Sequence, residues 1–167
     1  EKIGAGELVL SAANTFTGDM TVTGGTLSLS GGSALEESVN LILADGTTVN
    51  VQTSEVVGSV ASVTGGTVAL GANTLTLSGA VSTSFAGNVT GGTFSGFFVN
   101  FGNTTTMTGD STMTGTMGTT GGTLIMAAGA TTGAIPAGGT GTNGVFTPKG
   151  GALANNPAPV KLGARPP

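Results

Sequence analysis

Apolar and polar residues alternate in short runs along most of the chain. Met20 and Val22 flank Thr21, and Leu27 and Leu29 flank Ser28. A period of two predicts half-buried β-strands. Gly, Asn and Asp between the runs limit each strand to about three to five residues. Strands this short are stable only when they stack on copies above and below, so the pattern predicts a coil of strands.

A Gly-Gly corner between strand-forming residues recurs four times, in residues 22–27, 63–68, 89–94 and 120–124. Successive corners lie 41, 26 and 30 residues apart, and the spacing of 41 fits two turns of about 20 residues. We therefore expect about seven rungs of short strands. At about 4.8 Å for each rung, they would form a rod of about 35 Å.

The first thirty residues carry the clearest version of this repeat. Their order closely resembles the passenger-associated repeat of bacterial autotransporters, with Phe16 where Tyr is usual and Ala12 where Gly is usual. The positions that fall on the pattern are Gly4, Gly6, Leu8, Leu10, Ser11, Asn14, Thr15, Phe16, Thr17, Gly18, Thr21, Val22, Gly25, Thr26 and Leu27. Elsewhere only fragments recur, such as residues 72–79. The resemblance implies an all-β protein, a right-handed parallel β-helix (β-solenoid) exported to a bacterial surface, and it implies no particular activity.

The composition excludes several classes of chemistry. Cys and His are absent, which removes thiolate and imidazole as nucleophiles, general bases and metal ligands. The net charge of −4 disfavours nucleic acid as a partner, and no apolar run approaches the length of about 18 residues that a membrane span needs. No Gly-Gly corner continues into the Gly-x-Asp of calcium-binding repeats. We expect no cofactor and no metal.

Parallel β-helices can also host polysaccharide lyases and hydrolases, which need clustered carboxylates with Lys or Arg nearby. Asp45 and Asp110 are isolated in this sequence, and no basic residue occurs between positions 3 and 148. We therefore predict that the protein is not an enzyme.

Two segments depart from the repeat. Residues 34–40 have a helix-like composition and predict a short helical turn or cap on the rod, with a solvated loop as the alternative. Residues 94–101 contain four of the seven Phe residues. These phenylalanines are Phe94, Phe97, Phe98 and Phe101. Their clustering predicts either a core stack across two rungs or an exposed apolar contact patch.

The end of the chain differs again, because residues 148–167 contain five of the six prolines. Proline at this density prevents strand pairing and favours an extended arm. We assign residues 1–147 to the solenoid domain and 148–167 to this C-terminal arm. Three of the four basic residues lie in the arm, whereas seven of the eight acidic residues lie in the first third of the chain. The candidate subunit contacts are Lys149, Lys161, Arg165, Pro157, Pro159 and Val160 in the arm, and Glu1, Glu7 and Asp19 at the head.

These observations support two hypotheses for function. The first is an exported structural subunit that assembles end to end into an extracellular or cell-surface fibre, with the arm lying on the neighbouring subunit; its partner is a second copy of itself. The second is a stalk or adhesin fragment of an autotransporter passenger that binds host, cell or matrix surfaces. The chain starts at Glu1 instead of Met, which fits a mature product or a cut fragment. In either case we expect a secreted protein or one on the outer surface of a bacterium.

Overall fold

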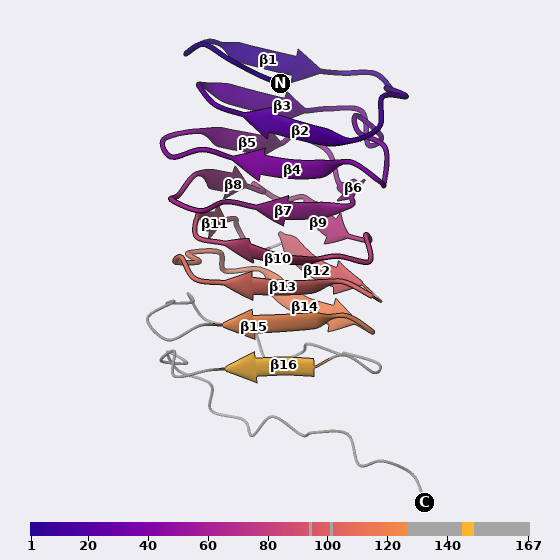
Figure 1. Ribbon diagram of the computed structural model, residues 1–167, viewed down its shortest axis with the longest axis vertical. Coiled ribbons are helices and arrows are strands. Elements are labelled where there is room, and N and C mark those ends of the chain that lie inside the picture. Colours follow the sequence, from indigo (N-terminus) through magenta and orange to yellow (C-terminus); the bar gives the residue numbers. More distant parts are fainter. Residues whose placement is uncertain (94, 101, 127–144, 149–167) are drawn as a thin grey trace, which may run out of the picture.

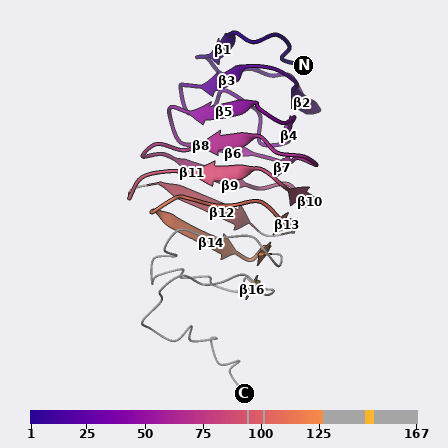
Figure 2. The same ribbon diagram turned by 90° about the vertical axis from the view of Figure 1, so that its left-hand side faces the viewer.

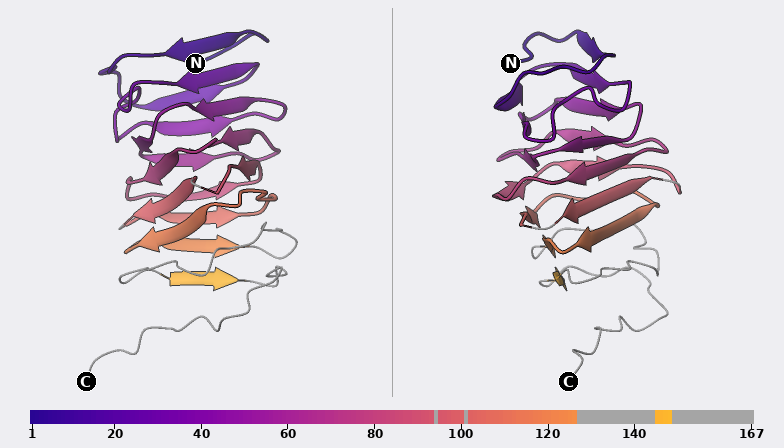
Figure 3. Two further views of the ribbon diagram at one scale, coloured as in Figure 1. Left: turned by 180° about the vertical axis from the view of Figure 1, so that it is seen from behind. Right: turned by 90° about the vertical axis from the view of Figure 1, so that its right-hand side faces the viewer.

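The computed structural model describes residues 1–93, 95–100, 102–126 and 145–148. Within these residues the chain forms strands, turns and bends, without a helix. The strands wind into one tall stack with the N-terminal rung at one end, as Figure 1 shows and as the side and rear views in Figures 2 and 3 confirm. The prediction of an all-β parallel β-helix is confirmed.

The strands lie on three faces of the coil, and some turns lack a strand on one of them. The first face contains β2 (Asp19–Val22), β4 (Asn40–Leu43), β7 (Ser59–Ala61), β10 (Ser82–Phe85), β13 (Thr104–Met107), β15 (Thr123–Met126) and β16 (Val145–Pro148). The second face contains β1 (Glu7–Leu10), β3 (Thr26–Leu29), β5 (Thr48–Val51), β8 (Thr67–Ala69) and β11 (Asn88–Thr90). The third face contains β6 (Glu55–Val57), β9 (Thr74–Leu77), β12 (Gly96–Asn100) and β14 (Thr116–Thr120).

Every pairing between these strands is parallel, and paired residues are 19 to 22 positions apart in sequence. On the first face, an isolated bridge between Ser62 and Phe85 joins β2, β4 and β7 to the four later strands. That face therefore carries seven strands within the described residues, which agrees with the predicted number of rungs and gives about six turns between the first and the last.

The positions of the Gly-Gly corners explain their uneven spacing in sequence. The corners at 24–25 and 65–66 both connect the first face to the second, two turns apart. The corner at 91–92 connects the second face to the third, and the one at 121–122 connects the third face to the first. The same sequence phrase thus turns the chain at three different edges of the rod. Only the spacing of 41 residues therefore measures whole turns.

The core is a column of mainly aliphatic side chains, with Phe85 and Phe97 among them, that runs through the middle of the stack. In β9, for example, Leu75 and Leu77 are buried while Thr74 and Thr76 are half-buried, as the period of two predicts. Side chains from one rung pack on those of the next, so the core extends along the axis instead of thickening.

Residues 34–40 form no helix, and they do not cap an end of the rod. They contain a turn in which the Val39 N–H donates to the Glu36 carbonyl at 2.9 Å. Ala34 and Leu35 point into the core, where they take the place of a third-face strand beside β6. The helix-like composition reflects this need for small and apolar inward side chains in an irregular corner.

The solenoid continues past the point where the strand pattern in the sequence weakens. Strand β16 pairs in parallel with β15, and Pro148, the first residue of the expected arm, is its last residue. The remainder of the arm, residues 149–167, lies outside the described residues.

Candidate functional site

The N-terminal end of the rod is the surface on which apolar side chains gather. Strand β1 pairs with β3 on one side only and is the last strand of its ladder. Its register places Leu8 opposite the buried Leu27, so Leu8 points towards the core. Leu8 is nevertheless 37% exposed, because no rung covers it.

Other large apolar residues are exposed in the same rung. Ile3 is 69% exposed, Val9 47% and Phe16 38%. Outside this rung, the exposed large apolar side chains of the described residues are Val63 and Val81. Within the given sequence, the first rung therefore presents a strand edge and a cross-section of the core on which a further rung can stack.

Lys2 closes part of this end. Its backbone forms a parallel bridge with Val22, so residues 1–3 cover one edge of the first face. Its ammonium group is buried and donates to the carbonyl oxygens of Ile3 at 3.1 Å, Gly4 at 2.7 Å and Gly24 at 2.7 Å. These three bonds replace the water that a lysine side chain normally keeps. Sequence reasoning did not identify Lys2, because the carbonyls that bind it come partly from the next turn.

The acidic residues predicted as subunit contacts all lie at this end and are exposed. Each also accepts a hydrogen bond within the chain. Glu1 Oε1 accepts from Thr23 Oγ1, Glu7 Oε1 from Ser28 Oγ, and Asp19 Oδ1 from Asn40 Nδ2. Their proposed basic partners, Lys149, Lys161 and Arg165, and the arm residues Pro157, Pro159 and Val160 lie outside the described residues, so the predicted contacts remain predictions.

The two described phenylalanines of the cluster at 94–101 point to opposite sides of their strand. Phe97 is fully buried and packs in the core between Leu75 and Met117, its register partners on β9 and β14. Phe98 points outward and is half-buried, with its ring close to Gly96 and Gly118. Phe97 therefore belongs to the core stack and cannot contribute to an exposed patch. Phe94 and Phe101 lie outside the described residues.

Glu55 is a buried carboxylate that the sequence analysis did not single out. It points inward from β6, is 2% exposed, and accepts hydrogen bonds from the N–H groups of Ala34 at 3.1 Å and Leu35 at 3.0 Å. The sequence feature that could have identified Glu55 as buried is its position two residues before Val57, because a period of two places both side chains in the core. Glu55 supplies acceptors to an irregular segment that has no strand to pair with.

Within the described residues, no group of three or more Asp and Glu side chains is close enough to hold a metal ion. The same part of the chain contains no helix long and apolar enough to cross a membrane.

Comparison with known proteins agrees with this architecture. Residues 1–29 match the family described as the passenger-associated-transport-repeat. Over 88 residues, or 53% of this chain, the sequence is 44% identical to the adhesin BmaC autotransporter of Brucella suis biovar 1 (strain 1330), and the match covers 3% of that relative. No solved structure is significantly similar to the chain. The predicted resemblance to an autotransporter passenger repeat is confirmed.

Proposed function

We propose that the chain is a rod-shaped segment of an autotransporter passenger that contributes to adhesion at the outer surface of a bacterium. The observation that carries this proposal is the 44% identity to an autotransporter adhesin over 88 residues, and the parallel solenoid of the described residues is consistent with it. The chain spans only 3% of that relative, so the adhesive activity belongs to the proposal. A rod of stacked rungs suits this role, because each added turn extends the surface outward without changing the cross-section. We further propose a structural, non-enzymatic role, since the described residues present no clustered carboxylates with a base.

Display of the chain on a laboratory bacterium by an autotransporter carrier would test adhesion directly. The displayed chain should increase attachment to cultured mammalian cells or immobilised matrix proteins over the empty carrier. A displayed Gly109→Val variant, whose side chain would collide with the preceding turn, serves as the misfolded control. Attachment equal to that of the empty carrier, with the folded chain shown to be on the surface, would contradict the proposal.

End-to-end assembly is a second candidate function, with the N-terminal rung as the site of contact. A further rung from a second copy would pair with β1 and cover Leu8, as a preceding rung of the same polypeptide would. The acidic residues of the first third and the basic residues of the arm (148–167) also favour contact between the N-terminal end of one copy and the arm of another. Each exposed ion pair would contribute only about 0 to 1 kcal/mol.

Electron microscopy and light scattering would test assembly with a matched pair of variants. Leu8→Lys places a charge at the proposed contact, whereas Val63→Lys places the same charge on a side chain that is 90% exposed and distant from the end. Filaments should be lost with Leu8→Lys, weakened by removal of residues 148–167, and retained with Val63→Lys. If the unmodified chain stays monomeric at high concentration, end-to-end assembly is wrong and the adhesive role is unaffected.

A further inference from the structure

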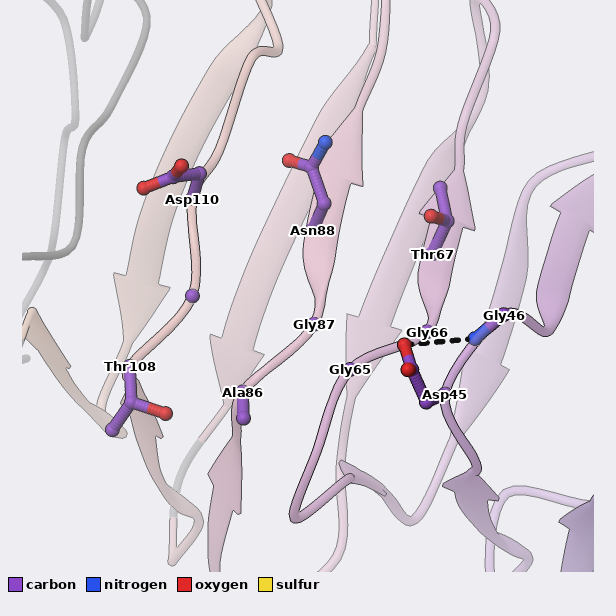
Figure 4. Close-up of a pocket in the computed structure, with 11 residues that line it drawn as sticks. Asp45, Gly46, Gly65, Gly66, Thr67, Ala86, Gly87, Asn88, Thr108 and Asp110 are labelled. Atoms are coloured by element: carbon purple, nitrogen blue, oxygen red, sulfur yellow. Dashed lines mark hydrogen bonds between the residues drawn. The ribbon is translucent and has the colours of Figure 1, made fainter.

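An open groove of about 480 Å³ runs along one edge of the rod, where the first face turns into the second. It crosses four consecutive corners, so it is about 14 Å long at about 4.8 Å for each rung. Figure 4 shows two rows of lining residues with bare backbone between them. The lining residues are Asp45, Gly46, Gly65, Gly66, Thr67, Ala86, Gly87, Asn88, Thr108, Gly109 and Asp110.

The floor of this groove follows from the way the corners stack. A Cβ atom on Gly87 would lie 2.3 Å from the carbonyl oxygen of Gly66, and one on Gly109 would lie 2.2 Å from that of Gly87. Side chains at these positions would force the turns apart. The glycines are therefore required by the fold and by themselves indicate no ligand, but they leave a flat strip of peptide groups that a ligand can approach closely.

The rim of the groove carries polar side chains from several turns. Thr67 and Asn88 are register partners on β8 and β11, and Asp110 follows them in the next turn. Asp45 and Thr108 lie in the opposite row and are exposed (Figure 4). Asp45 is oriented by the Gly46 N–H, which donates to its Oδ1 at 2.9 Å.

Asn88 adds an unsatisfied group. Its Oδ1 atom lies below the surface and has no hydrogen-bond partner in the chain. A buried carbonyl oxygen without a partner is costly, by about 1 to 3 kcal/mol. A hydroxyl donor bound in the groove, with a small rotation of the amide, would satisfy it.

The chemistry of the groove narrows the class of ligand. Two carboxylates and the absence of any basic residue between positions 3 and 148 disfavour anions such as nucleic acids and acidic glycans. Ala86 supplies the one apolar side chain in the lining, so an apolar ligand would bury little. Asp45 and Asp110 are three rungs apart, about 14 Å, and cannot share a metal ion. Carboxylate, amide and hydroxyl groups above bare backbone suit a neutral, hydroxyl-rich chain.

We propose that this groove binds a neutral glycan strand lying along the rod axis. The proposal rests on the adhesive role proposed above and names the class of ligand for it. Each rung would offer one or two polar side chains to successive sugars, and the open shape would admit an internal stretch of a polysaccharide as well as an end.

Titration of the purified chain with soluble oligosaccharides, followed by NMR, tests this inference. Chitotetraose and cellotetraose serve as neutral probes and tetragalacturonate as the anionic one. A neutral probe should shift the amide signals of Gly66, Gly87 and Gly109 at concentrations of about 1 mM or below. The absence of shifts with both neutral probes at about 10 mM, or equal binding of the anionic probe, would overturn the proposal.

A matched pair of variants separates the groove from general surface effects. Thr67 lines the groove, whereas Thr76 on β9 lies on the third face, and both are half-buried. Thr67→Arg should fill the groove and weaken binding at least about tenfold, whereas Thr76→Arg should leave it unchanged. Equal effects of the two variants would refute the site. If bacteria that display Thr67→Arg adhere as well as those that display the unmodified chain, the groove is not the adhesive site, and the adhesive role is unaffected. If the purified chain binds sugars but the displayed chain does not adhere, only the adhesive role is wrong.

Discussion

Single polar residues inside the rod act as substitutes for missing strand pairs. Glu55 accepts hydrogen bonds from two backbone N–H groups of the irregular segment at residues 34–35, and Lys2 donates to three carbonyl groups at the first corner. Both occur where the regular ladder is interrupted. A buried charged group is tolerated there because it is surrounded by backbone dipoles of the opposite sign.

Replacement of Glu55 by Ala should therefore destabilise the protein by about 2 to 4 kcal/mol, because two buried N–H groups lose their acceptors and a cavity remains. Chemical unfolding followed by circular dichroism would measure the change. Glu37→Ala, at an exposed position in the same corner, is the control and should stay within about 0.5 kcal/mol of the unmodified chain. Equal stability of the two variants would show that the Glu55 hydrogen bonds contribute nothing.

Such residues mark the limit of what this sequence could predict. The alternation around Leu75 and Leu77 placed those side chains in the core correctly, because the period of two is a local property. The roles of Lys2 and Glu55 depend on backbone groups about one turn away in the chain, which no local pattern contains. The groove was missed for the same reason, since Asp45 and Asp110 are isolated in sequence and line the same edge of the rod only after the chain has coiled.

At the level of elements, the corners determine how closely the turns stack. The strands need only keep their parallel register, whereas several corners leave no room for a side chain. The sequence indicated this through its repeated Gly-Gly phrase, but it could not assign each copy to one of the three edges. That assignment depends on how many residues each intervening corner holds.

A pair of glycine substitutions tests this role of the corners. Neither Gly109 nor Gly6 has a positive φ angle, so backbone strain is not involved. A Cβ on Gly109 would lie 2.2 Å from the carbonyl oxygen of Gly87, whereas a Cβ on Gly6 meets nothing within 4 Å. Gly109→Ala should lower stability by about 1 to 3 kcal/mol or more, and Gly6→Ala by less than about 0.5 kcal/mol. A thermal melt that ranks them in the opposite order would contradict tight corner stacking.

At the scale of the whole molecule, the rod is a one-dimensional array in which each turn contacts its neighbours. Equivalent positions in successive turns are aligned by the parallel register; Asn88, for example, occupies the position that Thr67 occupies in the turn before. One turn can therefore replace another in the stack. Stability should consequently depend on the number of whole turns, and the fold should not depend on any one of them.

Deletion of residues 67–87 removes one whole turn, with one strand from each face, and joins Gly66 to Asn88. This variant should keep a β-rich circular dichroism spectrum and a cooperative melt at a lower temperature. Deletion of residues 67–77 removes strands from two faces only and puts every later strand on the wrong face, so it should not fold. If both deletions fold equally well, the turn is not the repeating unit.

In the corner between β7 and β8, Val63 is 90% exposed, while the strands on either side keep their register. Extra residues at this point would enlarge a loop in the solvent and leave the ladder intact, at a free-energy cost that rises only slowly with loop length. A foreign epitope inserted between Val63 and Thr64 would therefore be carried at a fixed height on a rigid support. The molecule can thus serve as a display scaffold, in which the number of turns sets the length of the rod and one loop carries the inserted sequence.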